Sequence, residues 1–261
     1  MRVLHFVFSL YLIIFTVQGC KDIPRDNIFD PRNPNSMREQ QILLEAFVNT
    51  NTILADSVIY NQNMMTALSR LEIKYGAQII VAVHHRDLFE YQDSLAIFES
   101  EDIYARYVEA FDDAVKGVPD VFINGLGARI QGATSAASAE YRIESALQPF
   151  LIQNSHFTIE PEVILSAGTL NCSVTIARLG ATTANDILVK AFILQNVDDL
   201  WQRKAVRAIR RSNLIPALLP GERRELTFNA VTGLADNPTS VVIAVISADE
   251  FTVYQGVEIR L

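Results

Sequence analysis

The first half of the chain alternates between short apolar runs and longer segments in which apolar residues recur periodically. Residues 42–48 and 77–83 form nearly continuous apolar runs, which are typical of strands buried on both faces of a sheet. Between these runs, apolar residues recur at spacings of three, four and seven up to about Tyr75, and Gly76 follows, as expected at the end of a helix. This pattern predicts a βαβ unit with a right-handed crossover.

The pattern then predicts a second helix, a hairpin and a closing helix. Residues 100–115 are acidic and amphipathic, which favours a helix. Pro119 precedes a short apolar strand, and a turn at Asn124-Gly125 leads into residues 128–131, which is typical of a hairpin. Residues 134–152 are expected to form the closing helix.

Beyond Asn154 the pattern predicts strands alone. Seven segments show the short apolar and β-branched runs that are typical of strands, and turns rich in Gly, Asn, Asp or Pro separate them. The segments are residues 156–165, 169–179, 186–195, 203–210, 223–231, 239–248 and 251–261. Seven short strands in succession favour a β-sandwich of the immunoglobulin-like kind over residues 154–261.

The order strand, helix, strand, helix, hairpin and helix resembles the thioredoxin fold. The resemblance implies that residues 41–153 form a thioredoxin-like domain, with Pro119 at the position of that fold's cis-proline. A thioredoxin-like domain followed by a β-sandwich is similar to a group of bacterial outer-membrane lipoproteins. The predicted fold class is therefore an α/β thioredoxin-like domain followed by an all-β immunoglobulin-like sandwich.

The resemblance also identifies the positions at which thioredoxins carry their redox cysteines. In the segment Phe47-Val-Asn-Thr-Asn-Thr-Ile-Leu-Ala55, these positions are Thr52 and Ala55. Thiol–disulfide exchange requires an attacking thiolate and a second sulfur, which a hydroxyl and a methyl group cannot replace. The resemblance therefore implies a redox-inactive domain, whose helix N-terminus and proline loop could still bind an extended peptide. The alternative is an empty cleft in which Pro119 only shapes the turn.

The N-terminal segment predicts export and lipid attachment. Arg2 is followed by an apolar stretch, Val3–Val17, and by Gln18-Gly19-Cys20, a pattern that resembles the lipobox of bacterial lipoproteins. We expect a signal peptide over residues 1–19 and a lipid on Cys20, with residues 20–40 as a flexible tether rich in Pro and Asn. The first expected partner is therefore a membrane, reached through the acyl chains.

Composition and charge narrow the location and the partners. Lys21, directly after the lipidation site, lacks the aspartate that retains many lipoproteins at the inner membrane, which favours the outer membrane of a bacterial cell envelope. The formal net charge of −8 opposes nonspecific binding to nucleic acid, which requires excess Lys and Arg. Cys20 and Cys172 are the only cysteines, so lipidation of Cys20 leaves no structural disulfide and Cys172 is expected to be a buried thiol.

A polar cluster after the second predicted strand is the strongest candidate for another chemistry. His84, His85 and Asp87, with Glu90 and Asp93 nearby, include ligands that zinc accepts and groups that can act as a general base. Adjacent histidines on an extended segment point to opposite faces, which opposes a shared metal site. We therefore favour a solvated polar loop and expect no cofactor, with a metal site as the alternative.

Positive charge concentrates around the fourth predicted strand of the second half. Trp201, Arg203, Arg207 and Arg210 could bind a phosphate-bearing lipid or an acidic partner. The same residues could instead form the solvent-facing side of an edge strand, where Lys and Arg prevent unwanted strand pairing.

Two classes of function remain open. The favoured hypothesis is a noncatalytic cell-envelope lipoprotein that binds a protein, a peptide or a glycan, through the degenerate thioredoxin-like fold or through the sandwich. The alternative is an envelope enzyme, either metal-dependent around His84, His85 and Asp87 or with residual redox function.

Overall fold

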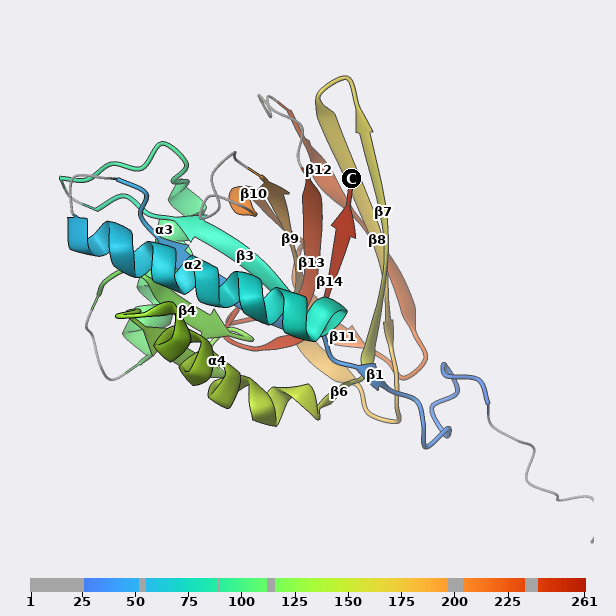
Figure 1. The fold of residues 1–261 in the computed structure, drawn as a ribbon. Coiled ribbons are helices and arrows are strands. Elements are labelled where there is room, and N and C mark those ends of the chain that lie inside the picture. Colours follow the sequence, from blue (N-terminus) through green and yellow to red (C-terminus); the bar gives the residue numbers. More distant parts are fainter. Residues whose placement is uncertain (1–25, 52–54, 89, 112–115, 197–203, 233–238) are drawn as a thin grey trace, which may run out of the picture.

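The computed structural model describes residues 26–51, 55–88, 90–111, 116–196, 204–232 and 239–261 (Figure 1). The signal peptide, Cys20, Thr52, Trp201 and Arg203 lie outside the described residues, so the predictions made for them rest on the sequence alone. Within the described ranges, no helix is both long enough and apolar enough to cross a membrane. The fold in this part of the chain is mixed α/β and largely β.

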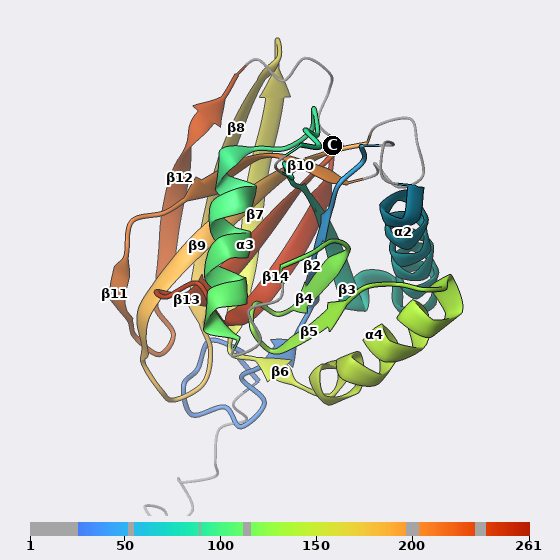
Figure 2. The ribbon, with the colours of Figure 1, turned by 90° about the vertical axis from the view of Figure 1, so that its left-hand side faces the viewer.

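The N-terminal half has the element order that the thioredoxin resemblance implies. Its elements are β2 (Ile42–Val48), α2 (Ala55–Tyr75), β3 (Ile79–His85), α3 (Phe98–Ala110), β4 (Asp120–Ile123), β5 (Ala128–Gln131) and α4 (Ala136–Leu151). Strands β2 and β3 are parallel, and β4 and β5 extend the sheet antiparallel on the other side of β2. Helices α2 and α4 cover one face of these strands, and α3 covers the other (Figure 2).

Local sequence explains where these elements begin and end. Gly76 adopts φ +54° directly after α2, a conformation that favours glycine, and the chain then passes through a short 3₁₀ turn (Gly76–Gln78) into β3. The side chain of Ser135 accepts a hydrogen bond from the Ser138 backbone N–H at 3.2 Å and caps α4. Every residue of β2 and β3 is buried, as their continuous apolar runs predict.

The C-terminal half consists of strands that form two facing layers. The strands are β7 (Phe157–Ser166), β8 (Thr169–Arg178), β9 (Ala184–Gln195), β10 (Ala205–Arg211), β11 (Ile215–Leu218), β12 (Arg223–Val231), β13 (Ser240–Ser247) and β14 (Val253–Arg260). All seven predicted strands are present, and β11 is a short addition that pairs with β9. Strands β12, β8 and β7 form a separate three-stranded sheet, and an apolar core lies between it and the larger sheet.

The two halves share one sheet and one core. Strand β10 runs parallel to β3, with Ala205 opposite Val83, so the strand order is β14-β13-β9-β10-β3-β2-β4-β5. A second contact joins the halves where Gln40 Nε2 donates to the Val253 carbonyl at 2.9 Å. The core beneath α3 takes residues from both halves, among them Leu43, Phe47, Phe122, Phe192 and Val242. The sequence predicts a sandwich appended to a thioredoxin-like domain, whereas the structure places strands of both halves side by side in one sheet.

The segment predicted to be a flexible tether is folded against the body from residue 26 onward. Strand β1 (Arg38–Glu39) pairs with β6 (Asn154–Ser155). The Ser36 hydroxyl donates to the Ile28 carbonyl and accepts from the Gly180 N–H at 2.8 Å, and Ser36 is buried. The tether prediction is therefore wrong for residues 26–40, because turns and polar contacts with distant residues order a segment that has few apolar side chains.

A network of buried charged groups connects α3 to both halves of the sheet. Glu250, in the turn between β13 and β14, lies 2.6 Å from Lys190 Nζ, 3.2 Å from Arg106 Nη2 and 3.3 Å from Arg211 Nη2. Also on α3, the Tyr107 hydroxyl donates to Glu45 Oε2 at 2.8 Å and lies 3.4 Å from the Glu250 carbonyl oxygen. An unpaired charge in the protein interior destabilises the fold. The elements that carry these residues, which are α3, β2, β9, β10 and the β13–β14 turn, must therefore pack against one another in the folded chain.

We predict that Glu250→Gln lowers the free energy of unfolding by about 3 kcal/mol, since it leaves Lys190 buried without its nearest carboxylate. Urea-induced unfolding of the full chain measures this change. Glu140→Gln is the matched control, because Glu140 pairs with Arg70 in a partly exposed ion pair at 3.2 Å and its loss should change the free energy by less than about 1 kcal/mol. Equal effects of the two substitutions would contradict the role given to the buried network.

Candidate functional site

The end of β2 and the loop after β3 meet in a group of amide, hydroxyl, imidazole and carboxyl side chains: Asn49, Thr50, His85 and Asp93. We call it the thioredoxin corner, because the sequence resemblance assigns the redox cysteines of thioredoxins to positions just after β2. After β2, the Thr50 N–H and hydroxyl both donate to Asp93 Oδ2, at 2.7 and 2.8 Å. The Asn49 side-chain amide donates to the carbonyls of Arg86 and Tyr91, at 2.7 and 2.8 Å. These bonds tie the end of β2 to the loop that follows β3, so the polar groups of the corner largely satisfy one another.

His85 completes this corner from the end of β3. Its side chain is fully buried, and its Nδ1 lies 3.0 Å from Asp93 Oδ2. Burial alone would raise the pKa of Asp93, but the hydrogen bonds from His85 and from the backbone of Thr50 and Leu95 lower it to about 2. Asp93 is therefore a carboxylate at neutral pH, and the corner holds a buried Asp–His pair.

His84 lies on the opposite face of β3, beneath α3. Its ring stacks on Phe47 with the centroids 4.6 Å apart, its Nδ1 lies 2.9 Å from Ser100 Oγ, and its Nε2 lies 3.3 Å from Glu45 Oε1. Burial lowers the pKa of His84, so the imidazole is neutral at pH 7. The two adjacent histidines thus point to opposite faces, as the extended backbone predicts.

The polar cluster after β3 differs from the solvated loop that the sequence favours. His84 and His85 belong to β3 and are both fully buried. His85 Nδ1 lies within hydrogen-bond distance of Asp93 Oδ2, whereas His84 Nε2 and Glu45 Oε1 lie 3.3 Å apart and form no hydrogen bond. The Asp87 carboxylate instead accepts the Asp93 N–H at 2.8 Å. The structure does not bring His84, His85 and Asp87 to one point, and in the described part of the chain no three His, Cys, Asp or Glu side chains form a group that could hold a metal ion.

Pro119, Ala55 and Cys172 are three further residues from the sequence analysis that lie within the described part of the chain. The Val118–Pro119 peptide bond is cis, and the Pro119 carbonyl accepts from the Gly132 N–H at 2.8 Å. Ala55 is the first residue of α2, whereas Thr52 lies outside the described residues. The prediction that Cys172 is a buried thiol is confirmed: it lies in β8 within the sandwich core, and burial raises its pKa to about 11.

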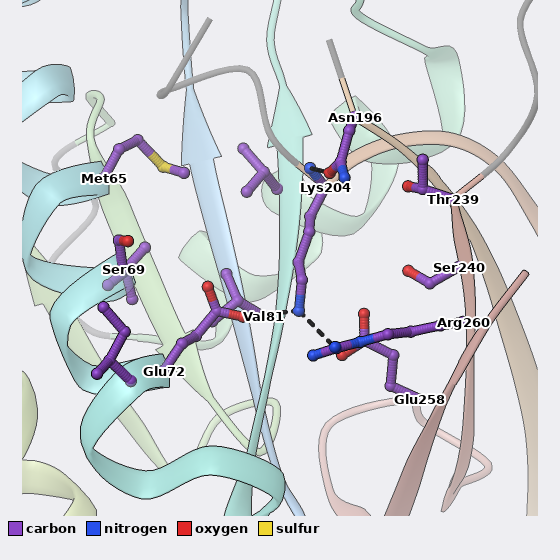
Figure 3. A pocket seen from close by; sticks show the side chains of 13 residues that line it. Met65, Ser69, Glu72, Val81, Asn196, Lys204, Thr239, Ser240, Glu258 and Arg260 are labelled. Carbon is purple, nitrogen blue, oxygen red and sulfur yellow. Dashed lines mark hydrogen bonds and ion pairs between the residues drawn. The ribbon is translucent and has the colours of Figure 1, made fainter. Parts of the chain in front are cut away.

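A cleft of about 470 Å³ opens where α2 faces the ends of β13 and β14 (Figure 3). Lys204 crosses it, with its Nζ 2.6 Å from Glu72 Oε1 on α2 and 2.9 Å from Glu258 Oε2 on β14. Burial alone would lower the pKa of Lys204, but the two carboxylates raise it above its ordinary value. Apolar side chains of α2 and β3 line one side, including Met65, Leu68, Val81 and Val83.

No local signal in the sequence identifies this cleft. Lys204 is separated from Glu72 by 132 residues and from Glu258 by 54, so the three meet only because β10 lies beside β3. Of the predicted basic surface, Arg207 and Arg210 are half-buried in β10, and Arg210 Nη1 donates to the carbonyl of Ile209 at 3.0 Å. Trp201 and Arg203, the other members, lie outside the described residues.

Comparison with known proteins identifies similar folds. No protein-family model and no curated protein sequence matches the chain. The structure of HBP35 of Porphyromonas gingivalis is similar with a TM-score of 0.61 and 10% identity, over 86% of this chain and 76% of that one. Protein AGR_C_4864 from Agrobacterium tumefaciens is similar with a TM-score of 0.52 and 14% identity, over 85% and 95% of the two chains. Both similarities therefore extend across the two halves described above.

A third similarity is partial. A domain of the outer membrane lipoprotein Omp28 from Porphyromonas gingivalis matches over 41% of this chain and 88% of that domain, at 15% identity. The TM-score of this match is 0.31. At 10% and 14% identity, the first two similarities show a shared fold and do not identify a ligand for this chain.

We predict that the stability contributed by Asp93 is lost in acid. Because its pKa is lowered from 3.8 to about 2 in the folded chain, this contribution is fully present above about pH 4 and disappears as the pH falls through 2. The difference in unfolding free energy between the native chain and Asp93→Asn should therefore shrink by about 2 kcal/mol over that range. Urea unfolding at a series of pH values measures it, and a difference that stayed constant would show that the pairing with His85 is not the cause.

Proposed function

We propose that this protein is a noncatalytic cell-envelope lipoprotein that binds a protein, a peptide or a glycan on a degenerate thioredoxin fold. The observation that carries the proposal is the composition of the corner. Thr50 and His85 are both hydrogen-bonded to Asp93 there, and the thiol of Cys172 is buried within the sandwich. An Asp–His pair without a sulfur nucleophile cannot exchange disulfides.

The cleft between α2 and β14 offers a surface for such binding. Its apolar side is formed by α2 and β3, and its opposite side carries Lys204, Glu258 and Arg260. A concave surface that combines apolar contact with a few fixed polar groups is the usual form of a binding site. Because Lys204 already has two carboxylate partners, we expect a ligand to contact the rim groups and the apolar side rather than to displace this bridge.

The second half supports an immunoglobulin-like interpretation of the sandwich. Strands β7, β8 and β12 form one layer, and β10, β9, β13 and β14 follow one another in the facing sheet. Each layer combines strands from early and late in this half, as the long connections of immunoglobulin-like sandwiches also do. We propose that this half serves as a rigid support that presents the cleft at its junction with α2.

The cell-envelope location in this proposal rests on the sequence alone. Arg2, the apolar stretch Val3–Val17 and Gly19-Cys20 support signal cleavage and lipidation, and Lys21 favours the outer membrane. The described N-terminal segment contacts the body from Phe29 onward, where the Arg223 guanidinium lies 5.2 Å from the Phe29 ring centroid. We therefore propose that only a short segment separates the lipid from the folded protein, so that the body stays near the membrane surface.

The lipid anchor predicts a specific change on mutation of the first cysteine. Cys20→Ala should move the protein from the membrane fraction to the soluble fraction, because a single residue carries all the acyl chains. Cys172→Ala is the matched control and should leave the protein in the membrane fraction. Immunoblots of fractionated cells measure both, and membrane retention of the Cys20→Ala variant would contradict the proposal.

If the domain lacks disulfide exchange only because the two cysteines are absent, introducing both cysteines should restore this activity. The full native chain should not reduce insulin with a thiol reductant, whereas the double variant Thr52→Cys/Ala55→Cys should, since it supplies both the attacking and the resolving sulfur. The single variant Ala55→Cys is the control, because one thiol cannot complete the cycle. Insulin reduction by the native chain would overturn the noncatalytic proposal.

A further inference from the structure

A second pocket, of about 420 Å³, lies at the opposite end of the junction between the halves. It is formed where the end of α4, β6, the start of β9 and the start of β14 meet. We call it the amide pocket, because side-chain amides of Gln40, Gln153, Asn154 and Asn185 line it. No Asp, Glu or Lys is among the described residues that line it, and Arg178 supplies its only fixed charge.

Arg178 is a buried cation without a counter-ion. Three cationic side chains are buried in the described part of the chain: Arg86, Lys190 and Arg178. Arg86 lies 2.8 Å from a carboxylate oxygen of Glu101, and Lys190 lies 2.6 Å from one of Glu250. Arg178, which is 8% exposed, has no such partner among the described residues. A buried guanidinium without an anion is costly, so this position is suited to receive one.

The hydrogen bonds of Arg178 fix its guanidinium but leave donors available. Its Nε and Nη2 donate to the carbonyl and the hydroxyl of Thr182, both at 2.7 Å, and its Nη1 donates to the His156 carbonyl at 3.2 Å. These acceptors are neutral and account for three of the five N–H groups of a guanidinium. Burial lowers the pKa of Arg178, because desolvation disfavours the charged form of the guanidinium.

An aromatic pair gives the pocket an apolar wall. The rings of Phe157 and Tyr254 are stacked with their centroids 5.7 Å apart, and the Arg178 guanidinium lies 4.9 Å from the Phe157 centroid. Asn154 and Asn185 are exposed at the rim, where their amides can both donate and accept hydrogen bonds. Because Phe157 is buried, the half-buried Tyr254 is the ring of this pair that a ligand can reach. An aromatic ring beside amides and hydroxyls is suited to a ligand with an apolar ring face and several hydroxyl groups.

We propose that the amide pocket binds a saccharide that carries a carboxylate, with the carboxylate at Arg178 and the hydroxyl groups at the rim amides. The carboxylate supplies the charge that the buried guanidinium lacks, and the sugar hydroxyls match side chains that both donate and accept. This site is distinct from the thioredoxin corner and from the cleft at Lys204, and it does not depend on the function proposed for them.

Calorimetric titration of the full chain, kept in a detergent without a sugar headgroup, tests this proposal. Glucuronic acid is the probe, and glucose is the matched control because it has the same ring without the carboxylate. We expect glucuronic acid to bind at least tenfold more tightly than glucose, as a charge-assisted hydrogen bond to a buried group implies. Equal affinity, or no binding of glucuronic acid at millimolar concentration, would overturn the proposal.

Two variants locate the binding. Arg178→Gln should abolish the preference for glucuronic acid over glucose, and Asn185→Ala, at an exposed rim position that does not affect folding, should weaken both sugars several-fold. Unchanged affinity for glucuronic acid in Asn185→Ala would place the sugar elsewhere and overturn the assignment, even if Arg178→Gln did not fold. A short peptide that bound through its terminal carboxylate more tightly than glucuronic acid would show that the occupant is a peptide.

Discussion

The position of Glu250 determines how the two halves of this protein meet. Its carboxylate lies within 3.3 Å of nitrogen atoms of Lys190, Arg106 and Arg211, which belong to β9, α3 and β10. Because Lys190 and Glu250 are buried, no arrangement that separates these elements keeps the charges paired. Apolar packing supplies most of the stability of such a core, but it tolerates sliding, whereas charge pairing at these distances does not. The network therefore holds α3 of the first half against β9 and β10 of the second half.

Both pockets are lined by residues of the two halves. The cleft at Lys204 needs α2 and β14 at a distance that one ammonium group can span, and the amide pocket needs β6 beside β14. Neither pocket exists within one half alone. A change in the packing of α3 would alter both, since α3 carries Arg106 and Tyr107, which contact Glu250 and Glu45. Binding at either pocket is thus coupled to how firmly the halves are held together.

Local patterns were sufficient to predict the elements, and they failed where distant residues decide the outcome. The runs 42–48 and 77–83 and the periodic segment up to Tyr75 predict β2, β3 and α2 closely, because burial of one or both faces leaves a direct imprint on the sequence. The pairing of β10 with β3 cannot be recognised from a local sequence pattern, since about 120 residues separate the two strands. His84 and His85 suggest a solvated loop only while their partners Glu45, Ser100 and Asp93 are unknown.

The distribution of satisfied and unsatisfied polar groups indicates where recognition should be concentrated. In the thioredoxin corner, Asp93 accepts from Thr50 and His85, although His85 Nε2 is buried there without a hydrogen-bond partner among the described residues. In the cleft, Lys204 is held by two carboxylates. A ligand gains little from groups whose hydrogen bonds are already made, because it must break one bond to form another. Arg178 differs, since its charge has no counter-charge in the described residues and its remaining N–H groups face no carboxylate. We therefore expect the amide pocket to select ligands by their charge. The hydrogen bonds of the thioredoxin corner instead hold the end of β2 rigidly against the loop after β3.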